Sequence, residues 1–205
     1  MDRYRCFDEL RRHEIEGRDY RIRLRAGVTG FAVMAPHGGM IERGTSQLAE
    51  AIAGAEHTFY AFEGIKSANN HCLHITSDRF DEPRALAAAG QEQTVITIHG
   101  AKGAERSIYT GGLDQVLEER VSGALTAVGF TAMHDPSPTR QGRGATNLCN
   151  RGRRRRGIQI ELAQGLRKQL FDPPGGTGLW TPNDRFHLFV RTLRTVLAEV
   201  VNGEK

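Results

Sequence analysis

The feature that most limits how this chain can fold is the alternation of short strand-like and helix-like segments along its length. Residues 20–25 alternate apolar and basic side chains, which is typical of a strand with one exposed face. Residues 31–36 form a continuous apolar run that ends in Pro-His-Gly-Gly, which favours a buried central strand. By the same reasoning we expect further strands at residues 58–62, 73–75, 94–98 and 157–162.

Helical segments separate these strands. Residues 45–54 begin with two hydroxyl side chains that can cap a helix and end on a glycine. Other helices are expected from Glu82-Pro83 onward, at 112–128 and at 183–201, with a loop at Pro173–Gly176. Strands alternating with helices of this length predict an α/β fold, in which helices flank an open mixed or parallel sheet. We expect one domain spanning residues 1–205.

Composition narrows the kinds of protein this can be. No apolar run approaches the roughly 20 residues that span a bilayer, so we expect no membrane partner. The charged N-terminus lacks the apolar core of a signal peptide, which predicts synthesis in the cytoplasm, with release by cell lysis as an option. The cysteines, Cys6, Cys72 and Cys149, are odd in number and widely spaced, which argues against a disulfide framework. Any metal must therefore be held by histidine and carboxylate.

Two histidines stand where such a site is expected. His37 follows the predicted strand at 31–36, and His99 follows the one at 94–98; glycine comes next in both cases. Ligand sites of α/β sheets gather at the carboxyl ends of strands, and Glu42 lies in the loop after His37. Two imidazoles and one carboxylate make a three-ligand zinc set that leaves one position for water, although cobalt and manganese also suit such ligands. The alternative is that both are ordinary loop histidines, because their spacing is not a diagnostic motif.

Three further residues are candidates for the chemistry around a metal. Glu161 interrupts an apolar strand and would serve as general base to an attacking water; the alternative is a solvent-exposed glutamate on an edge strand. Asn150 and Arg151 offer an amide and a guanidinium side by side, and the guanidinium fork matches a substrate carboxylate. The alternative for Arg151 is an ordinary surface arginine.

Much of the net charge of +4 comes from an arginine-rich run at residues 151–156. Its positive field would attract a polyanion, so that reversing the charge at residues 153–156 should raise KM for an anionic polymer. A solvated loop explains the run equally well. Nucleic-acid binding is the third interpretation, but the chain lacks zinc-finger spacing and a phosphate-binding glycine loop, and its aromatic content is only 7%.

Several short motifs occur together in a fixed order. They are Pro36-His-Gly-Gly-Met-Ile-Glu42-Arg-Gly-Thr, Phe62-Glu-Gly64, Leu73-His-Ile-Thr-Ser77, Phe80-Asp-Glu-Pro83, Ile98-His-Gly100, Asn147-Leu-Cys-Asn-Arg151 and Gln159-Ile-Glu-Leu162. In this set the chain closely resembles the poly-γ-glutamate hydrolases of bacteria and their phages, from about residue 30 to residue 167. Each motif is weak alone, but the ordered set is specific.

The resemblance implies an open α/β fold related to the zinc carboxypeptidases and hydrolysis of the γ-amide bonds of poly-γ-glutamate. It implies zinc on His37, Glu42 and His99, with Glu161 as general base and the pair Asn150–Arg151 holding a substrate carboxylate. Four residues separate His37 from Glu42, where carboxypeptidases have two.

We expect His74 to be a structural residue or to contact a metal ligand, and not to bind the metal itself. The predicted partner is an acidic polymer, bound by a monomer. Two alternatives stay open: a zinc amidohydrolase for another acidic N-acyl or γ-glutamyl compound, and a nucleic-acid-binding protein of the phage-replication type, although nucleic acid is not the partner we expect.

Overall fold

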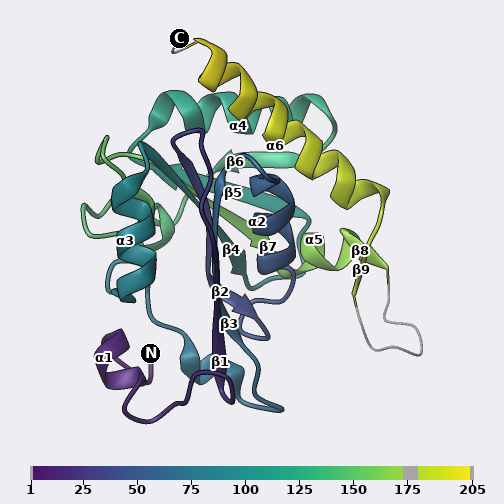
Figure 1. Cartoon of the computed structure of the whole chain (residues 1–205). Helices are drawn as coiled ribbons and strands as arrows, with labels where there is room; N and C mark the ends of the chain where they lie inside the picture. The colour runs from purple at the N-terminus through teal and green to yellow at the C-terminus, as the bar shows by residue number, and fades with distance from the viewer. Residues whose placement is uncertain (1, 173–179, 204–205) are drawn as a thin grey trace.

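The computed structural model of the chain describes residues 2–172 and 180–203, and it is built around one large mixed sheet (Figure 1). The strand order is β1-β3-β2-β4-β7-β5-β6. Strands β2, β3, β4 and β7 run parallel to one another, whereas β1, β5 and β6 run the opposite way. The strands are β1 (Tyr20–Arg25), β2 (Phe31–Gly39), β3 (Thr58–Gly64), β4 (Thr94–Ala101), β5 (Ser107–Gly112), β6 (Thr131–His134) and β7 (Ile158–Ala163). A short separate hairpin pairs β8 (Phe171–Asp172) with β9 (Thr181–Pro182).

Helices cover both faces of the sheet and make two apolar cores (Figure 1). One core lies between the sheet and the helices α2 (Thr45–Ala53), α4 (Gln115–Ala127), α5 (Gln164–Gln169) and α6 (Asp184–Gly203). The other lies beneath α1 (Phe7–Leu10) and α3 (Pro83–Gln91). Side chains alternate across each strand, so that Val33 and Ile98 enter the first core while Met34 and Val95 enter the second. Strands β2 and β3 place apolar side chains in both cores, as strands covered on both sides do, whereas β7 contributes only to the first core.

The predicted α/β class with an open mixed sheet is confirmed, and so are most of its elements. Strands begin at Tyr20, Phe31, Thr58 and Thr94, as expected from the pattern, and α2, α3, α4 and α6 occupy the predicted helical segments. The loop predicted at Pro173–Gly176 lies outside the described residues, and the single domain stays a prediction. Within the described ranges, no helix combines the length and apolarity needed to cross a membrane.

One predicted strand, at residues 73–75, is wrong. The chain there forms a 3-10 helix, η1 (Asn70–Leu73), followed by a segment without regular structure. Leu73 and Ile75 are buried because they pack into the second core, without pairing in the sheet. Two strands of the main sheet, and the two of the short hairpin, were not expected: in the main sheet, β5 ends in two glycines, and β6 is short, largely exposed and at the edge. Neither has the apolar pattern by which strands are found in a sequence.

Candidate metal centre

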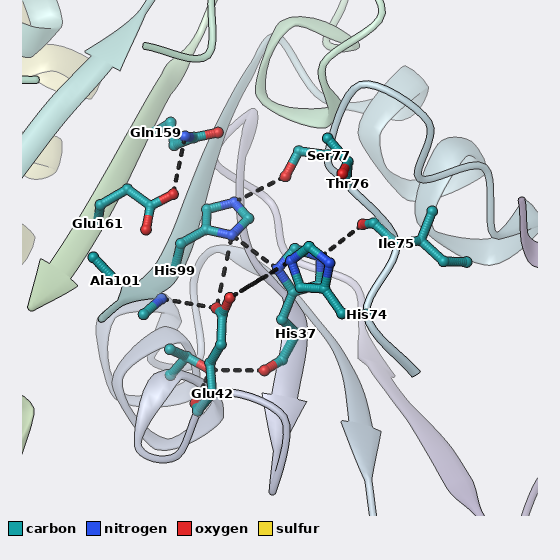
Figure 2. A network of polar contacts seen from close by, with 12 residues as sticks. His37, Glu42, His74, Ile75, Thr76, Ser77, His99, Ala101, Gln159 and Glu161 are labelled. Atoms are coloured by element: carbon teal, nitrogen blue, oxygen red, sulfur yellow. Dashed lines mark hydrogen bonds and ion pairs between the residues drawn. The ribbon is translucent and has the colours of Figure 1, made fainter. Parts of the chain in front are cut away.

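His37 and His99 lie side by side at the carboxyl ends of two neighbouring parallel strands, β2 and β4. Both histidines are the third residue from the end of their strand, whereas the sequence placed them just after it. Each imidazole is 2% exposed. Their Nδ1 atoms are 3.2 Å apart and point toward each other (Figure 2). The parallel pairing of β2 with β4 therefore brings together two side chains that are 62 positions apart in the chain.

Glu42 reaches the same point from the loop between β2 and α2. Its Oε1 is 3.2 Å from His37 Nδ1, and its Oε2 is 3.8 Å from His99 Nδ1. The Gly100 amide donates a 2.7 Å hydrogen bond to Oε2, which fixes the carboxylate's orientation. The loop leaves β2 at Gly39, whose φ of 62° and close approach to the backbone of Gly64 exclude a side chain. This tight turn sends the loop back over the strand end.

The three side chains fit a metal such as zinc. His37 Nε2 contacts the carbonyl oxygen of Ile75 at 2.8 Å, so Nε2 carries the hydrogen and Nδ1 is left with its lone pair. Ligand atoms about 2.0–2.2 Å from a tetrahedral zinc lie roughly 3.3–3.6 Å from one another. The facing nitrogens and the carboxylate are spaced at 3.2–3.8 Å, close to this requirement. Among the described residues, His37, Glu42 and His99 form the group able to hold a metal ion.

Electrostatics in the buried cluster also favour a bound cation. Burial and the proximity of His37 lower the pKa of His99 to about 3, so His99 is neutral, which is the form that binds metal. Burial opposes the charge on Glu42, but the facing histidines outweigh it and lower the pKa of Glu42 to about 2. Burial likewise opposes a charge on His37, yet the Glu42 carboxylate raises its pKa. The ionised carboxylate thus needs a positive partner, which is either a proton on His37 or a metal ion.

Glu161 stands next to this cluster on β7. The parallel register pairs it with His99, so both side chains emerge on the same face of the sheet, opposite Ile160 and Leu162. Figure 2 shows Glu161 and Gln159 on one side of His99, and Gln159 Nε2 donates to Glu161 Oε1 at 3.2 Å. Burial, with the negative charge of Glu42, raises the pKa of Glu161 to about 8. Because β7 is an interior strand, the alternative of a solvent-exposed edge glutamate does not apply.

A cavity of about 340 Å³ opens onto these side chains. Two cationic residues that were not predicted, Lys102 and Arg140, line it together with the three candidate ligands and Glu161. The buried Asp135 carboxylate accepts hydrogen bonds from Arg140 Nε and Nη2 at 3.0 and 3.2 Å. Glu42, His74, Gly100 and Lys102 also line an adjoining cavity of about 730 Å³. The candidate centre therefore lies in a depression with positive side chains around it.

Asn150 and Arg151 do not line this cavity. Asn150 is 1% exposed, and its amide donates to the carbonyl oxygens of Gly142 and Gly144 at 2.7 and 2.9 Å while accepting from Gly157 N at 3.2 Å. The side chain thus holds the turn before β7 together. The Nε atom of Arg151 is itself buried. A substrate-binding role for this pair stays a prediction, whereas the surroundings of Asn150 are those of a structural residue.

Arg167 is a further residue that sequence reasoning did not single out. It is 7% exposed and donates to the carbonyl oxygens of Arg43 at 2.8 Å, Ala101 at 3.1 Å and Leu162 at 3.1 Å. These carbonyls belong to the Glu42 loop, the end of β4 and the end of β7. Gly100 makes room for the guanidinium, since a Cβ there would lie 2.6 Å from Arg167 Cζ. Arg167 therefore ties together the three segments that carry Glu42, His99 and Glu161.

Comparison with known proteins identifies relatives across nearly the whole chain. The family model described as poly-γ-glutamate hydrolase matches residues 4–192. The UPF0714 protein YndL of Bacillus subtilis (strain 168) is 36% identical in a match 200 residues long that covers 94% of this chain and 76% of YndL. A zinc-free apo structure of YndL superposes with a TM-score of 0.89 at 35% identity, covering 98% of this chain and 99% of the other.

More distant structures share the fold. A bacteriophage poly-γ-glutamate hydrolase has a TM-score of 0.92 at 24% identity, with 100% of both chains covered. A putative carboxypeptidase A from Shewanella denitrificans OS-217 has a TM-score of 0.51 at 11% identity, covering 89% of this chain and 65% of the other. The second likeness confirms the predicted carboxypeptidase-like architecture.

Proposed function

Because this chain belongs to the poly-γ-glutamate hydrolase family, we propose that it hydrolyses γ-glutamyl amide bonds of poly-γ-glutamate with a zinc ion on His37, Glu42 and His99. The observation that carries the proposal is the convergence of two Nδ1 atoms and one carboxylate within hydrogen-bonding distance in a buried pocket. The zinc-free structure of the relative YndL supports zinc as the metal. Zinc held there would activate a water molecule and polarise the amide carbonyl.

Glu161 is the proposed general base. It lies on the strand beside His99 and faces the same cavity. Burial raises its pKa, and the positive charge of a zinc ion bound nearby would favour the ionised form that accepts a proton. In the proposed reaction Glu161 takes a proton from the attacking water and gives it to the leaving nitrogen. Gln159 holds one oxygen of Glu161, which leaves the other free to face the water.

Lys102 and Arg140 are further proposed contacts for substrate carboxylates, besides the predicted pair Asn150 and Arg151. Every residue of poly-γ-glutamate carries a free carboxylate, so a chain passing the centre presents several anions. Lys102 is exposed and borders both adjoining cavities, and Arg140 borders the cavity that contains Glu161. The positions of these cations support an acidic polymer as the substrate.

The test is zinc content by ICP-MS together with depolymerisation of poly-γ-glutamate, measured on wild type and on His99→Ala. We expect about one zinc per chain and shortening of the polymer in the wild type, with both lost in the variant. His187→Ala, an exposed position on α6, is the matched control and should retain both. Zinc without shortening would redirect the proposal to another acidic amide. A wild type that takes up no zinc from added salt would remove the proposal.

A further inference from the structure

One short segment, His74–Ser77, contacts both histidine ligands of the candidate centre. The Ile75 carbonyl oxygen accepts from His37 Nε2 at 2.8 Å, and Ser77 Oγ lies 3.4 Å from His99 Nε2. The His74 ring packs against the His37 ring with centroids 4.0 Å apart (Figure 2). The partner of a histidine's outer nitrogen fixes which nitrogen faces the metal and how the ring is turned. The His74–Ser77 segment therefore controls the orientation of both imidazoles.

No strand pairing holds the His74–Ser77 segment in place. The Leu148 amide donates to the Ser77 carbonyl oxygen at 3.2 Å. The segment is also anchored by the carboxylate of Asp2, which accepts from Thr76 N at 2.8 Å, from Thr76 Oγ1 at 2.7 Å and from His74 Nδ1 at 2.7 Å. Arg79 donates to the same carboxylate at 2.6 Å. The Asp2 side chain is 10% exposed, so these bonds are partly shielded from water. One carboxylate thus binds a backbone amide and two side chains within three consecutive residues.

The first residues of the chain are also docked independently of Asp2. Tyr4, Phe7 and Leu10 are buried in the second core, and the Phe7 amide donates to Asp81 Oδ1 at 2.6 Å. Replacement of Asp2 is therefore expected to leave the N-terminal segment packed on the protein, while it removes the bonds of this carboxylate to the His74–Ser77 segment and to Arg79. This separation makes the contribution of the carboxylate measurable.

We propose that Asp2 is a positioning residue for the metal centre: by clamping the His74–Ser77 segment, it sets the direction in which His37 and His99 present their Nδ1 atoms. The inference rests on the proposed function, because it takes these histidines as metal ligands. The inference gives the N-terminal segment a part in metal affinity. Asp2 is more than 70 residues away in sequence from the residues that it contacts.

The test compares Asp2→Ala and Asp2→Asn with wild type, using zinc affinity from competition with a chromogenic chelator. Loss of the direct outer partner of a ligand typically costs about 10- to 100-fold in metal affinity. Asp2 acts one contact further out, through the His74–Ser77 segment, so we expect a loss of about tenfold, the lower end of this range, for Asp2→Ala. Asp2→Asn keeps one acceptor oxygen and should lose less. The thermal midpoint of the zinc-free protein, measured in parallel, separates loss of positioning from loss of fold.

The matched control is Asp8→Ala, which removes the same charge from an exposed aspartate of α1 that pairs with Arg11 and Arg12. Its zinc affinity should equal that of wild type. Equal affinity in Asp2→Ala and wild type would overturn the inference and leave the proposed function intact. An equal loss in Asp8→Ala would also overturn it, by showing a general charge effect. A wild type without zinc would overturn both.

Discussion

The two ends of the parallel strands each gather charged side chains, but they do so in different ways. At the carboxyl ends, His37, Glu42, His99 and Glu161 come from separate segments and converge on one cavity. At the amino ends, the charged residues are consecutive in one segment, the arginine-rich run. Backbone amides of this run donate to the backbone just before β4, from Arg153 N to Glu92 O and from Arg154 N to Gln93 O. Arg154 and Arg156 lie 4.0 and 3.8 Å from the Asp114 carboxylate.

The charges at the amino ends are neighbours in the sequence, whereas those at the carboxyl ends are neighbours only in the folded protein. The arginine run is conspicuous in the sequence because its residues are consecutive, yet it lies at the opposite end of the sheet from the candidate centre. The catalytic candidates are inconspicuous in the sequence because the fold alone brings them together. The sequence-based hypothesis that the arginine run binds the polymer at the site therefore lacks support from its position.

The largest expected effect at the carboxyl end is that of Glu161→Gln. Replacement of the carboxylate by an amide removes the proposed proton acceptor and should lower kcat about 10²- to 10⁴-fold. Zinc content by ICP-MS should be unchanged, because Glu161 is not one of the three candidate ligands. Glu119→Gln, at an exposed position on α4, is the control and should retain the wild-type kcat. A Glu161→Gln enzyme with wild-type kcat would contradict the proposed role of Glu161 and the assignment of the chemistry to the carboxyl ends of the strands.

Arg167→Met should produce the next largest effect, on stability. The substitution removes the Arg167 donor from three carbonyl oxygens, two at strand ends and one in the Glu42 loop, which is expected to lower the free energy of unfolding by about 3 kcal/mol. Urea-induced unfolding followed by circular dichroism measures this quantity. Arg191→Met, at an exposed position on α6, should change it by less than about 0.5 kcal/mol. Equal results for the two variants would contradict the role of Arg167 as a tie between segments.

Lys102→Ala tests the positive rim of the cavity. Loss of one exposed cation from the substrate path should raise KM for poly-γ-glutamate about fivefold at low salt, with kcat nearly unchanged. The difference should shrink as salt is added, because exposed charges are screened. Initial rates at several salt concentrations measure both effects, and a KM equal to that of wild type at low salt would exclude Lys102 as a substrate contact.

The smallest effect is expected at the amino end. Arg153→Glu combined with Arg155→Glu reverses two exposed charges at the far end of the strands from the cavity. Over that separation the field is largely screened at physiological salt, where the Debye length is about 8 Å, so KM should stay within about twofold of wild type. A rise in KM like that of Lys102→Ala would restore the arginine run as a polymer-binding surface.

Much of this architecture could be predicted from the sequence, and the limits have physical causes. The strands carrying His37 and His99 have strong apolar patterns, so their ends could be located and their histidines proposed as partners. Glu161 could be proposed because a carboxylate in an apolar strand requires an explanation. Lys102, Arg140 and Arg167 gave no such signal, since their roles depend on which segments lie beside them in the fold.

The predicted strand at residues 73–75 shows the opposite error. Its apolar side chains indicated a strand, but they are buried because they fill the second core, and the polar atoms of the same segment face the ligands. Asn150 shows the same ambiguity, because an amide beside a guanidinium fits both a substrate contact, which stays a prediction, and the buried turn in which the side chain lies. Sequence adjacency alone does not distinguish these two environments.

The position of β7 has a consequence for how the protein is made. It is the last strand of the main sheet to leave the ribosome, yet it lies between β4 and β5, which are synthesised earlier. A growing chain therefore contains all three candidate ligands while β4 and β5 still have unpaired edges that favour association with other chains. Insertion of β7 closes the sheet and delivers Glu161 in the same step. Completion of the main sheet and acquisition of the proposed proton acceptor are thus one event.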